Sequence, residues 1–111
     1  MDNTKDDSYY IKKMMRDIAF IIENTKEITQ DALENNEVLC DSILFRMIQI
    51  SENSVKLTPM FKESHNDIPW HAIKGMRNKI VHEYGDVVFD VVYQTVVVDI
   101  PEIYGKLNDL I

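Results

Sequence analysis

The chain has 111 residues, a formal net charge of −7 at pH 7, and only three glycines, three prolines and one cysteine. This length suits one core, which predicts a single domain over residues 1–111. The acidic balance argues against a domain that holds nucleic acid on a broad basic surface, so such contact must be local. The single Cys40 excludes an internal disulfide and a cysteine-based metal site. No segment has the length of a membrane span and the N-terminus lacks a signal-peptide apolar region, so we expect a cytoplasmic protein.

Apolar residues in the first half of the chain recur at helical spacing. The first helix is predicted from Ser8 to about Asn24, after an acidic start that favours a helix N-terminus. A short second helix is expected to begin at Thr29-Gln30-Asp31, where threonine can cap it, and to end near Asn35-Asn36. A long third helix is predicted from Glu37 to Leu57. Thr58-Pro59 would end it, because proline disfavours helical geometry in the residue before it.

The next segment is predicted as a loop from Phe61 to Asp67, followed by a fourth helix from about Pro69 to Glu83 with proline in its first turn. Gly85 then stands where a left-handed terminating residue is wanted. Arg77, His82 and Tyr84 therefore lie at or near the end of the fourth helix.

The last quarter of the chain is harder to assign. Residues 87–98 are rich in β-branched side chains, which favour a strand by propensity. A lone strand in a helical domain would have no partner, so a buried helix is predicted. Asp99, with Glu102 three positions on, is expected to cap a last helix that runs to the C-terminus. The predicted fold class is therefore all-α, an up-and-down bundle of about five helices.

The end of the fourth helix carries an arginine, an imidazole and a phenol within eight positions, in the run Gly75-Met76-Arg77-Asn78-Lys79-Ile80-Val81-His82-Glu83-Tyr84-Gly85. Arginine is a permanent, forked cation suited to phosphate, and histidine moves protons near neutral pH. Together they indicate chemistry on a phosphodiester. Lys74, Arg77 and Lys79 face only Glu83, which predicts a small positive patch; an ordinary solvated helix face explains the same charges equally well.

A helical wheel with about 100° per residue places Arg77 inside the apolar arc of this helix. A charge there must be paired, so Arg77 is expected either to bond a carboxylate such as Glu52 or to receive a phosphate. His82 lies roughly 140° around the helix from Arg77, with Asn78 between them. The two can flank one substrate group without touching. A structural ion pair for Arg77 and a dipole-compensating role for His82 stay open as alternatives.

Two further observations concern the face of the fourth helix that carries His82. His71 and His82 share it but stand about 16 Å apart by helical rise, so no metal site is expected there. Gly75 lies on the same side as His82 and would let another backbone or a nucleotide come close. The face is therefore a candidate dimer interface or cleft.

The residues Ile68-Pro69-Trp70 and the run from Gly75 to Tyr84 closely resemble the HepT family of HEPN-domain ribonuclease toxins, whose motif is arginine, four residues, histidine, any residue, tyrosine. The resemblance extends more weakly to Arg46–Leu57 and to Asp99-Ile100-Pro101. Ser51 and Asn53 depart from the small residues expected in that family, which bears on helix packing more than on chemistry.

This resemblance implies a homodimeric bundle in which two motifs line a shared cleft and cleave RNA without metal or another cofactor. Arg77 and His82 would be the catalytic residues, and Asn78, Lys74 and Lys79 would contact the substrate. The family also implies a partner, a nucleotidyltransferase antitoxin of the MntA type, which transfers adenylate to Tyr84.

Two other readings stay open. One is a catalytically silent helical binding module that positions substrate for a small nucleotidyltransferase. The other is a helical dimer in which Arg77 belongs to a structural ion pair.

Overall fold

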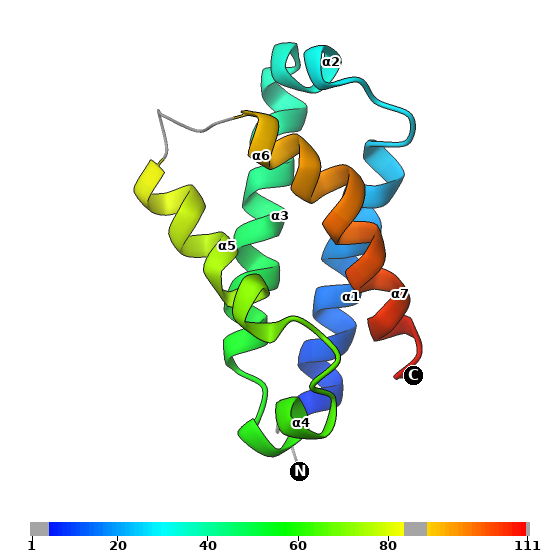
Figure 1. Cartoon of the computed structure of the whole chain (residues 1–111), viewed down its shortest axis with the longest axis vertical. Helices are drawn as coiled ribbons and strands as arrows, with labels where there is room; N and C mark the ends of the chain where they lie inside the picture. Colours follow the sequence, from blue (N-terminus) through cyan, green and yellow to red (C-terminus); the bar gives the residue numbers. More distant parts are fainter. Residues whose placement is uncertain (1–4, 84–88, 111) are drawn as a thin grey trace.

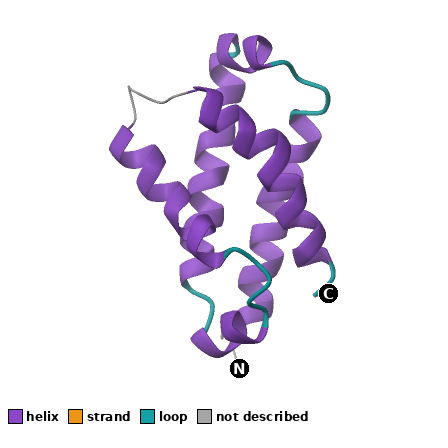
Figure 2. Cartoon of the chain, in the orientation of Figure 1, coloured by secondary structure: helices purple, strands orange, loops and turns teal. Residues whose placement is uncertain are grey.

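The computed structural model describes the backbone of residues 5–83 and 89–110, and the side chains of residues 5–78 and 89–110. Every regular element in these ranges is helical, as Figure 2 shows. The all-α prediction is therefore confirmed. The elements are α1 (Asp7–Asn24), α2 (Gln30–Asn35), α3 (Glu37–Val55), α4 (Pro59–Ser64), α5 (Trp70–Glu83), α6 (Phe89–Gln94), a π-helix (Thr95–Asp99) and α7 (Ile100–Asn108).

The long helices alternate in direction (Figure 1). α3 packs between α1 and α5, while α7 packs against α1. The segment from α6 through the π-helix to α7 forms one continuous rod in Figure 1. This arrangement is the predicted up-and-down bundle. None of the helices within the described ranges is long and apolar enough to cross a membrane.

The core consists of aliphatic side chains drawn from all the long helices. Fully buried members are Ile11, Met14, Ile18 and Ile21 of α1, Ile43 and Ile50 of α3, Ile73 of α5, and Ile100 and Leu107 of α7. Burying each such side chain stabilises the fold by about 1.5–3 kcal/mol relative to leaving it exposed. The apolar spacing read from the sequence therefore marks the faces that meet in the bundle.

Side-chain caps fix the starts of the first three helices. Asp6 accepts a hydrogen bond from the backbone N–H of Tyr9 at 3.0 Å, and Thr29 accepts one from Ala32 at 3.1 Å. Asn36 accepts from Leu39 at 3.1 Å. Each cap is typically worth about 1 kcal/mol. The predicted start of α2 at a threonine cap is confirmed, and the bounds of α1 are within a residue of those expected.

The segment predicted as a loop from Phe61 to Asp67 contains most of α4, so that prediction is wrong. α3 ends at Val55, and Thr58 caps the new helix by accepting from the N–H of Phe61 at 3.2 Å. Pro59 occupies the first turn, where its missing N–H is not needed. Asp7 holds this start in place, since its carboxylate accepts from Thr58 N at 2.8 Å and Thr58 Oγ1 at 2.7 Å. Thr58-Pro59 thus begins α4 as well as following α3.

The helix predicted over residues 87–98 is confirmed for its described part, residues 89–98, but it is not wholly buried. Val92 and Val96 are buried, whereas Val91 is 39% and Val98 49% exposed. The β-branched run is longer than one helical face can bury. The predicted cap at Asp99 is wrong, because its backbone is helical (φ −70°, ψ −44°) and its side chain makes no cap bond.

The chain instead passes through the π-helix directly into α7. Pro101 has no N–H to donate to a preceding carbonyl, and the wider π-helical turn ends two residues before it. The terminating role predicted for Gly85 falls outside the described residues.

Candidate functional site

α5 presents one side to the bundle and the other to solvent. Ile73 is completely buried and Met76 is 9% exposed, and both lie on the side that packs against the core. The residues of the opposite side are exposed; they are His71, Lys74, Gly75 and Asn78. The chemistry-bearing residues described on α5 therefore belong to its outer surface and to the edge beside α3.

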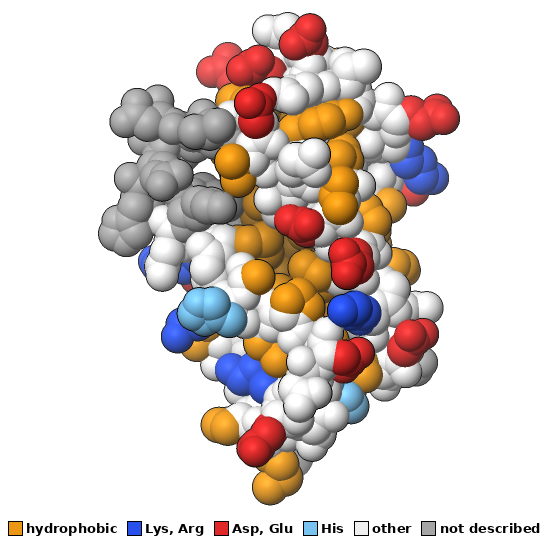
Figure 3. All heavy atoms as spheres, in the orientation of Figure 1, with side chains coloured by type: hydrophobic (Ala, Val, Ile, Leu, Met, Phe, Trp, Pro, Cys, Tyr) orange, Lys and Arg blue, Asp and Glu red, His pale blue; other side chains and the backbone are white. Residues whose placement is uncertain are grey.

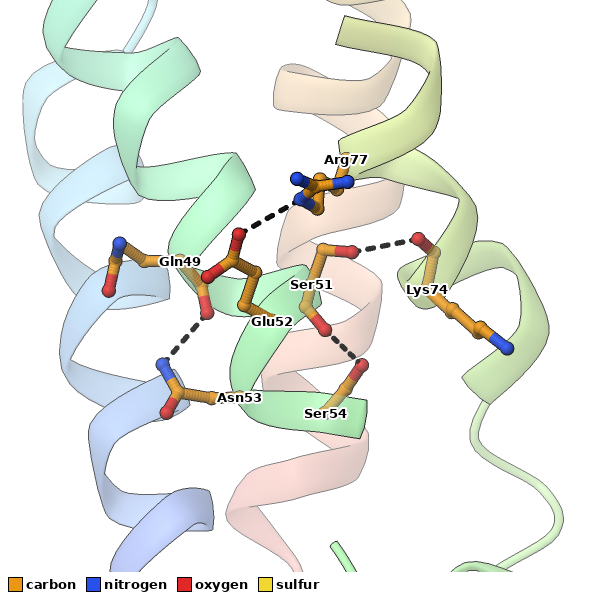
Figure 4. A network of polar contacts seen from close by, with 7 residues as sticks. All are labelled: Gln49, Ser51, Glu52, Asn53, Ser54, Lys74 and Arg77. Carbon is orange, nitrogen blue, oxygen red and sulfur yellow. Dashed lines mark hydrogen bonds and ion pairs between the residues drawn. The ribbon is translucent and has the colours of Figure 1, made fainter. Parts of the chain in front are cut away.

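Arg77 lies at that edge and pairs with Glu52 of α3. Its Nε donates a hydrogen bond to Glu52 Oε1 at 2.9 Å (Figure 4). The predicted carboxylate partner is confirmed. The prediction that Arg77 lies inside the apolar arc is wrong, because 45% of each of the two side chains is exposed. α5 buries only a narrow stripe, so the residue after Met76 emerges at the rim of the contact with α3.

Among the described side chains, the ion pair with Glu52 engages only one of the three guanidinium nitrogens of Arg77. Glu52 is the side-chain partner that the structure gives Arg77 among residues 5–78 and 89–110, and it uses only Nε. A guanidinium has five N–H donors in a rigid fork, and its two terminal nitrogens can bind two oxygens of one phosphate. Within the described part of the chain, Arg77 is thus oriented by a carboxylate at Nε, and no other described side chain bonds its terminal nitrogens.

A buried polar contact sets the position of α5 against α3. Ser51 is 1% exposed, and its hydroxyl donates to the backbone carbonyl of Lys74 at 2.8 Å. Lys74 precedes Arg77 by three residues, so this bond fixes the turn from which Arg77 projects. The side chain of Lys74 points away from α3 (Figure 4).

Two other polar residues of α3 are buried beside Ser51. Ser54 donates to the carbonyl of Ser51 at 2.7 Å, and Asn53 donates to the carbonyl of Gln49 at 2.8 Å. Ser51 and Asn53 were expected to affect helix packing, but the bond from Ser51 to α5 was not predicted. A serine at a position that the helical spacing of α3 places in the core was the available signal.

The structure describes the remaining predicted site residues only in part. Lys79 and His82 lie in the C-terminal half of α5, but their side chains are outside the described set, and Tyr84 lies beyond the described residues. The convergence of Arg77 and His82 on one group therefore stays a prediction. What the structure brings together is Arg77, its carboxylate partner and the exposed face that carries Lys74 and Asn78.

Comparison with known proteins gives this site its context. Residues 14–110 match the model of a family described as ribonuclease HepT-like. A "Probable ribonuclease HepT" of Thermococcus cleftensis is 34% identical over 104 residues, covering 89% of this chain and 94% of that protein. A predicted RNase of Caldanaerobacter subterraneus subsp. tengcongensis is 30% identical over 103 residues, covering 92% and 91%.

A third relative shows the same unit as part of a larger protein. A gamma-glutamylcyclotransferase and predicted RNase of Methanocaldococcus jannaschii is 32% identical over 104 residues, which cover 93% of this chain and 46% of that protein. No solved structure matches the chain significantly. The chain belongs to the HepT-like ribonuclease family, as its motif and helical bundle indicated.

Proposed function

We propose that this protein is a metal-independent endoribonuclease toxin whose reaction is carried by Arg77 and His82. The observation that supports the proposal most is the state of Arg77, which is held through Nε by Glu52 and is 45% exposed. A residue needed only for a structural pair would gain little from such an exposed position, since exposed ion pairs are worth about 0–1 kcal/mol. A residue that receives a phosphate needs this access.

In the proposed reaction, the 2′-oxygen of a ribose attacks the adjacent phosphorus and the bond to the 5′-oxygen breaks, leaving a 2′,3′-cyclic phosphate and a 5′-hydroxyl. His82 removes the proton from the 2′-hydroxyl or supplies one to the leaving 5′-oxygen, a contribution of about 10² to 10⁴ in rate. Arg77 binds the phosphate and stabilises the charge that develops on its oxygens. Asn78 orients the substrate or the imidazole.

One His82 cannot act as acid and base in the same step. The proposal therefore includes a homodimer in which the second chain's His82 supplies the other role. Lys74 and Lys79 add local positive charge to a chain whose net charge is −7.

The decisive experiment incubates purified protein with total RNA and a chelator, beside a His82→Ala variant. The wild type is expected to cleave and the variant to be inactive, while circular dichroism shows the same helical content for both. Equal cleavage by the two proteins would refute the role of His82. No cleavage by the wild type, with or without added divalent metal, would favour a silent module that positions substrate for a nucleotidyltransferase.

The regulation that we propose is adenylylation of Tyr84 by an antitoxin of the MntA type. In an α-helix continued to residue 84, Tyr84 would follow Arg77 by about two turns, so an attached adenylate would put bulk and negative charge where the substrate phosphate binds. Mass spectrometry of protein co-expressed with such a nucleotidyltransferase should show the peptide containing Tyr84 heavier by one or more adenylate groups. An unmodified peptide would contradict this regulation without touching the nuclease proposal.

A further inference from the structure

α4 and the first half of α5 carry a local excess of basic residues in an acidic chain. Residues 56–78 carry four Lys and Arg side chains against two Asp and Glu, whereas acidic residues exceed basic ones by seven over the whole chain. His65 and His71 lie in the same stretch. In Figure 3, several blue groups and one pale-blue group lie on the lower left, while single blue groups also lie at the upper right and right of centre.

Hydrogen bonds hold α4 against the first turn of α5. Trp70 Nε1 donates to the carbonyl of Lys62 at 3.1 Å and to the carbonyl of His65 at 3.0 Å. Lys62 is therefore next to Trp70, and Lys74 follows Trp70 by one helical turn on nearly the same side of α5. The backbone at Lys62 is thus joined to α5 at Trp70, one helical turn before Lys74.

This surface extends from Arg77 in one direction. Helical rise places Trp70 about 10 Å from Arg77 along α5, with Lys74 and His71 exposed on the way. Neither Lys62 nor Lys74 has a carboxylate within 4.0 Å among the described side chains. On the α3 side of Arg77 stands Glu52, which repels a phosphate. A polyanion that reaches Arg77 is therefore expected to extend toward Lys74 and not toward Glu52.

We propose that the surface formed by Lys62, His71 and Lys74, called here the α4–α5 basic surface, binds the phosphates of an RNA strand next to the one held by Arg77. This inference rests on the proposed ribonuclease function and adds to it a binding site for flanking nucleotides. The lysines neutralise individual phosphates, and His71 adds a donor, with full charge when protonated. Sequence selection is not required, because phosphate contacts fix the position of a strand without reading its bases.

Gly75 is consistent with close passage of a strand. It lies on the exposed side of α5, and a Cβ added there would meet nothing within 4 Å. The fold itself therefore does not require glycine, although glycine inside a helix costs about 0.5–1 kcal/mol relative to alanine. A backbone passing over this turn would benefit from the missing side chain.

The test measures binding of a fluorescent 12-nucleotide 2′-O-methyl RNA, which cannot be cleaved through a 2′-hydroxyl, as a function of salt. Each phosphate contact in a single strand contributes about 0.7 to the slope of log affinity against log salt. Lys62→Ala and Lys74→Ala should each lower the slope by about 0.7 and weaken binding at low salt. Lys26→Ala, which removes the same charge beyond the C-terminal end of α1 and far from α4, should leave the slope unchanged.

Three results would overturn the inference: no binding by the wild type, unchanged slopes in both variants, or an equal fall with Lys26→Ala. Cleavage of a dinucleotide by the wild type tests the ribonuclease proposal separately, because one phosphate does not extend to α4. Cleavage with unchanged slopes contradicts the α4–α5 basic surface alone. Lower slopes without any cleavage contradict the nuclease alone. If Lys62→Ala weakened only a complex with a protein partner, the surface would be a protein interface and the inference would be wrong.

Discussion

Glu52 accepts a hydrogen bond from Arg77 Nε, and this contact joins the middle of α5 to the exposed edge of α3 at 2.9 Å. The carboxylate orients the guanidinium and partly neutralises its positive charge. Because both side chains are 45% exposed, solvent screens the pair and its contribution to stability is small. The arrangement is better suited to presenting a cation than to holding two helices together.

Arg77→Ala should therefore remove activity and leave the fold nearly as stable. The expected loss is about 0–1 kcal/mol in the free energy of unfolding, the usual range for an exposed ion pair. Cleavage of RNA should fall by at least tenfold. Urea denaturation and a cleavage assay on the same preparation measure both quantities. A large drop in stability with unchanged cleavage would instead support a structural ion pair.

Two substitutions of Glu52 separate its orienting effect from its charge. Glu52→Gln keeps an oxygen acceptor for Arg77 Nε but removes the carboxylate that repels phosphate, so it should lower KM with little change in kcat. Glu52→Ala removes the acceptor, leaves the guanidinium unrestrained and should lower kcat. Steady-state kinetics on one RNA substrate distinguishes them. Identical kinetics for the two variants would show that Glu52 does not position Arg77.

The hydrogen bond between α3 and α5 leads to a separate prediction about the stability of the protein. Ser51→Ala removes the buried hydrogen bond to the carbonyl of Lys74 and should destabilise the protein by about 0.5–1.5 kcal/mol. Ser42→Ala is the matched control, because the Ser42 hydroxyl bonds only within its own helix, to Val38 O, and is half-buried. Chemical denaturation of both variants gives the comparison. An equal effect of the two substitutions would mean that the Ser51 bond does not fix α5.

Much of the bundle could be predicted because helical spacing and caps are local properties of the sequence. The bounds of α1 and α2 and the start of α3 follow from apolar periodicity and from Thr29 and its counterparts. α4 could not be predicted in the same way, since Thr58-Pro59 ends one helix and begins another, and Asp7, distant in the sequence, stabilises the second. The failed cap at Asp99 has a related cause: the helix simply continues through a π-helical turn.

The candidate site was predicted as a set of residues but not as a geometry. Glu52 was named as a possible partner of Arg77 because the helical wheel put this cation in the apolar arc of its helix, where a charge needs a carboxylate or a phosphate. The exposure of Arg77 depends on how much of α5 is buried, which only the packing of α5 on α3 decides. For the same reason the bond from Ser51 to Lys74, between two helices, was not visible in either segment alone.

Cys40 provides a pH-dependent test of the core. Burial raises the pKa of its thiol above the ordinary value of 9.0, and the carboxylates of Asp41 and Glu34 raise it further. The unfolded chain therefore loses this proton at a lower pH than the folded chain, so the contribution to stability is present below pH 9.0 and is lost as pH rises through the folded pKa. Between pH 7.5 and 10, the free energy of unfolding should fall more for wild type than for Cys40→Ala. Parallel curves would contradict the shift.

Gly75→Ala should make the protein more stable and less able to bind RNA. Alanine in place of an exposed helical glycine is expected to add about 0.5–1 kcal/mol to the free energy of unfolding, and nothing in the described structure lies within 4 Å of the new Cβ. Gly105→Ala on α7 is the matched control, because the space around its Cβ is equally open and it should gain similar stability. If a strand passes over α5, only Gly75→Ala should weaken binding of the 2′-O-methyl RNA, by several fold. Unchanged affinity in both variants, with both stabilised, would show that nothing approaches this turn closely.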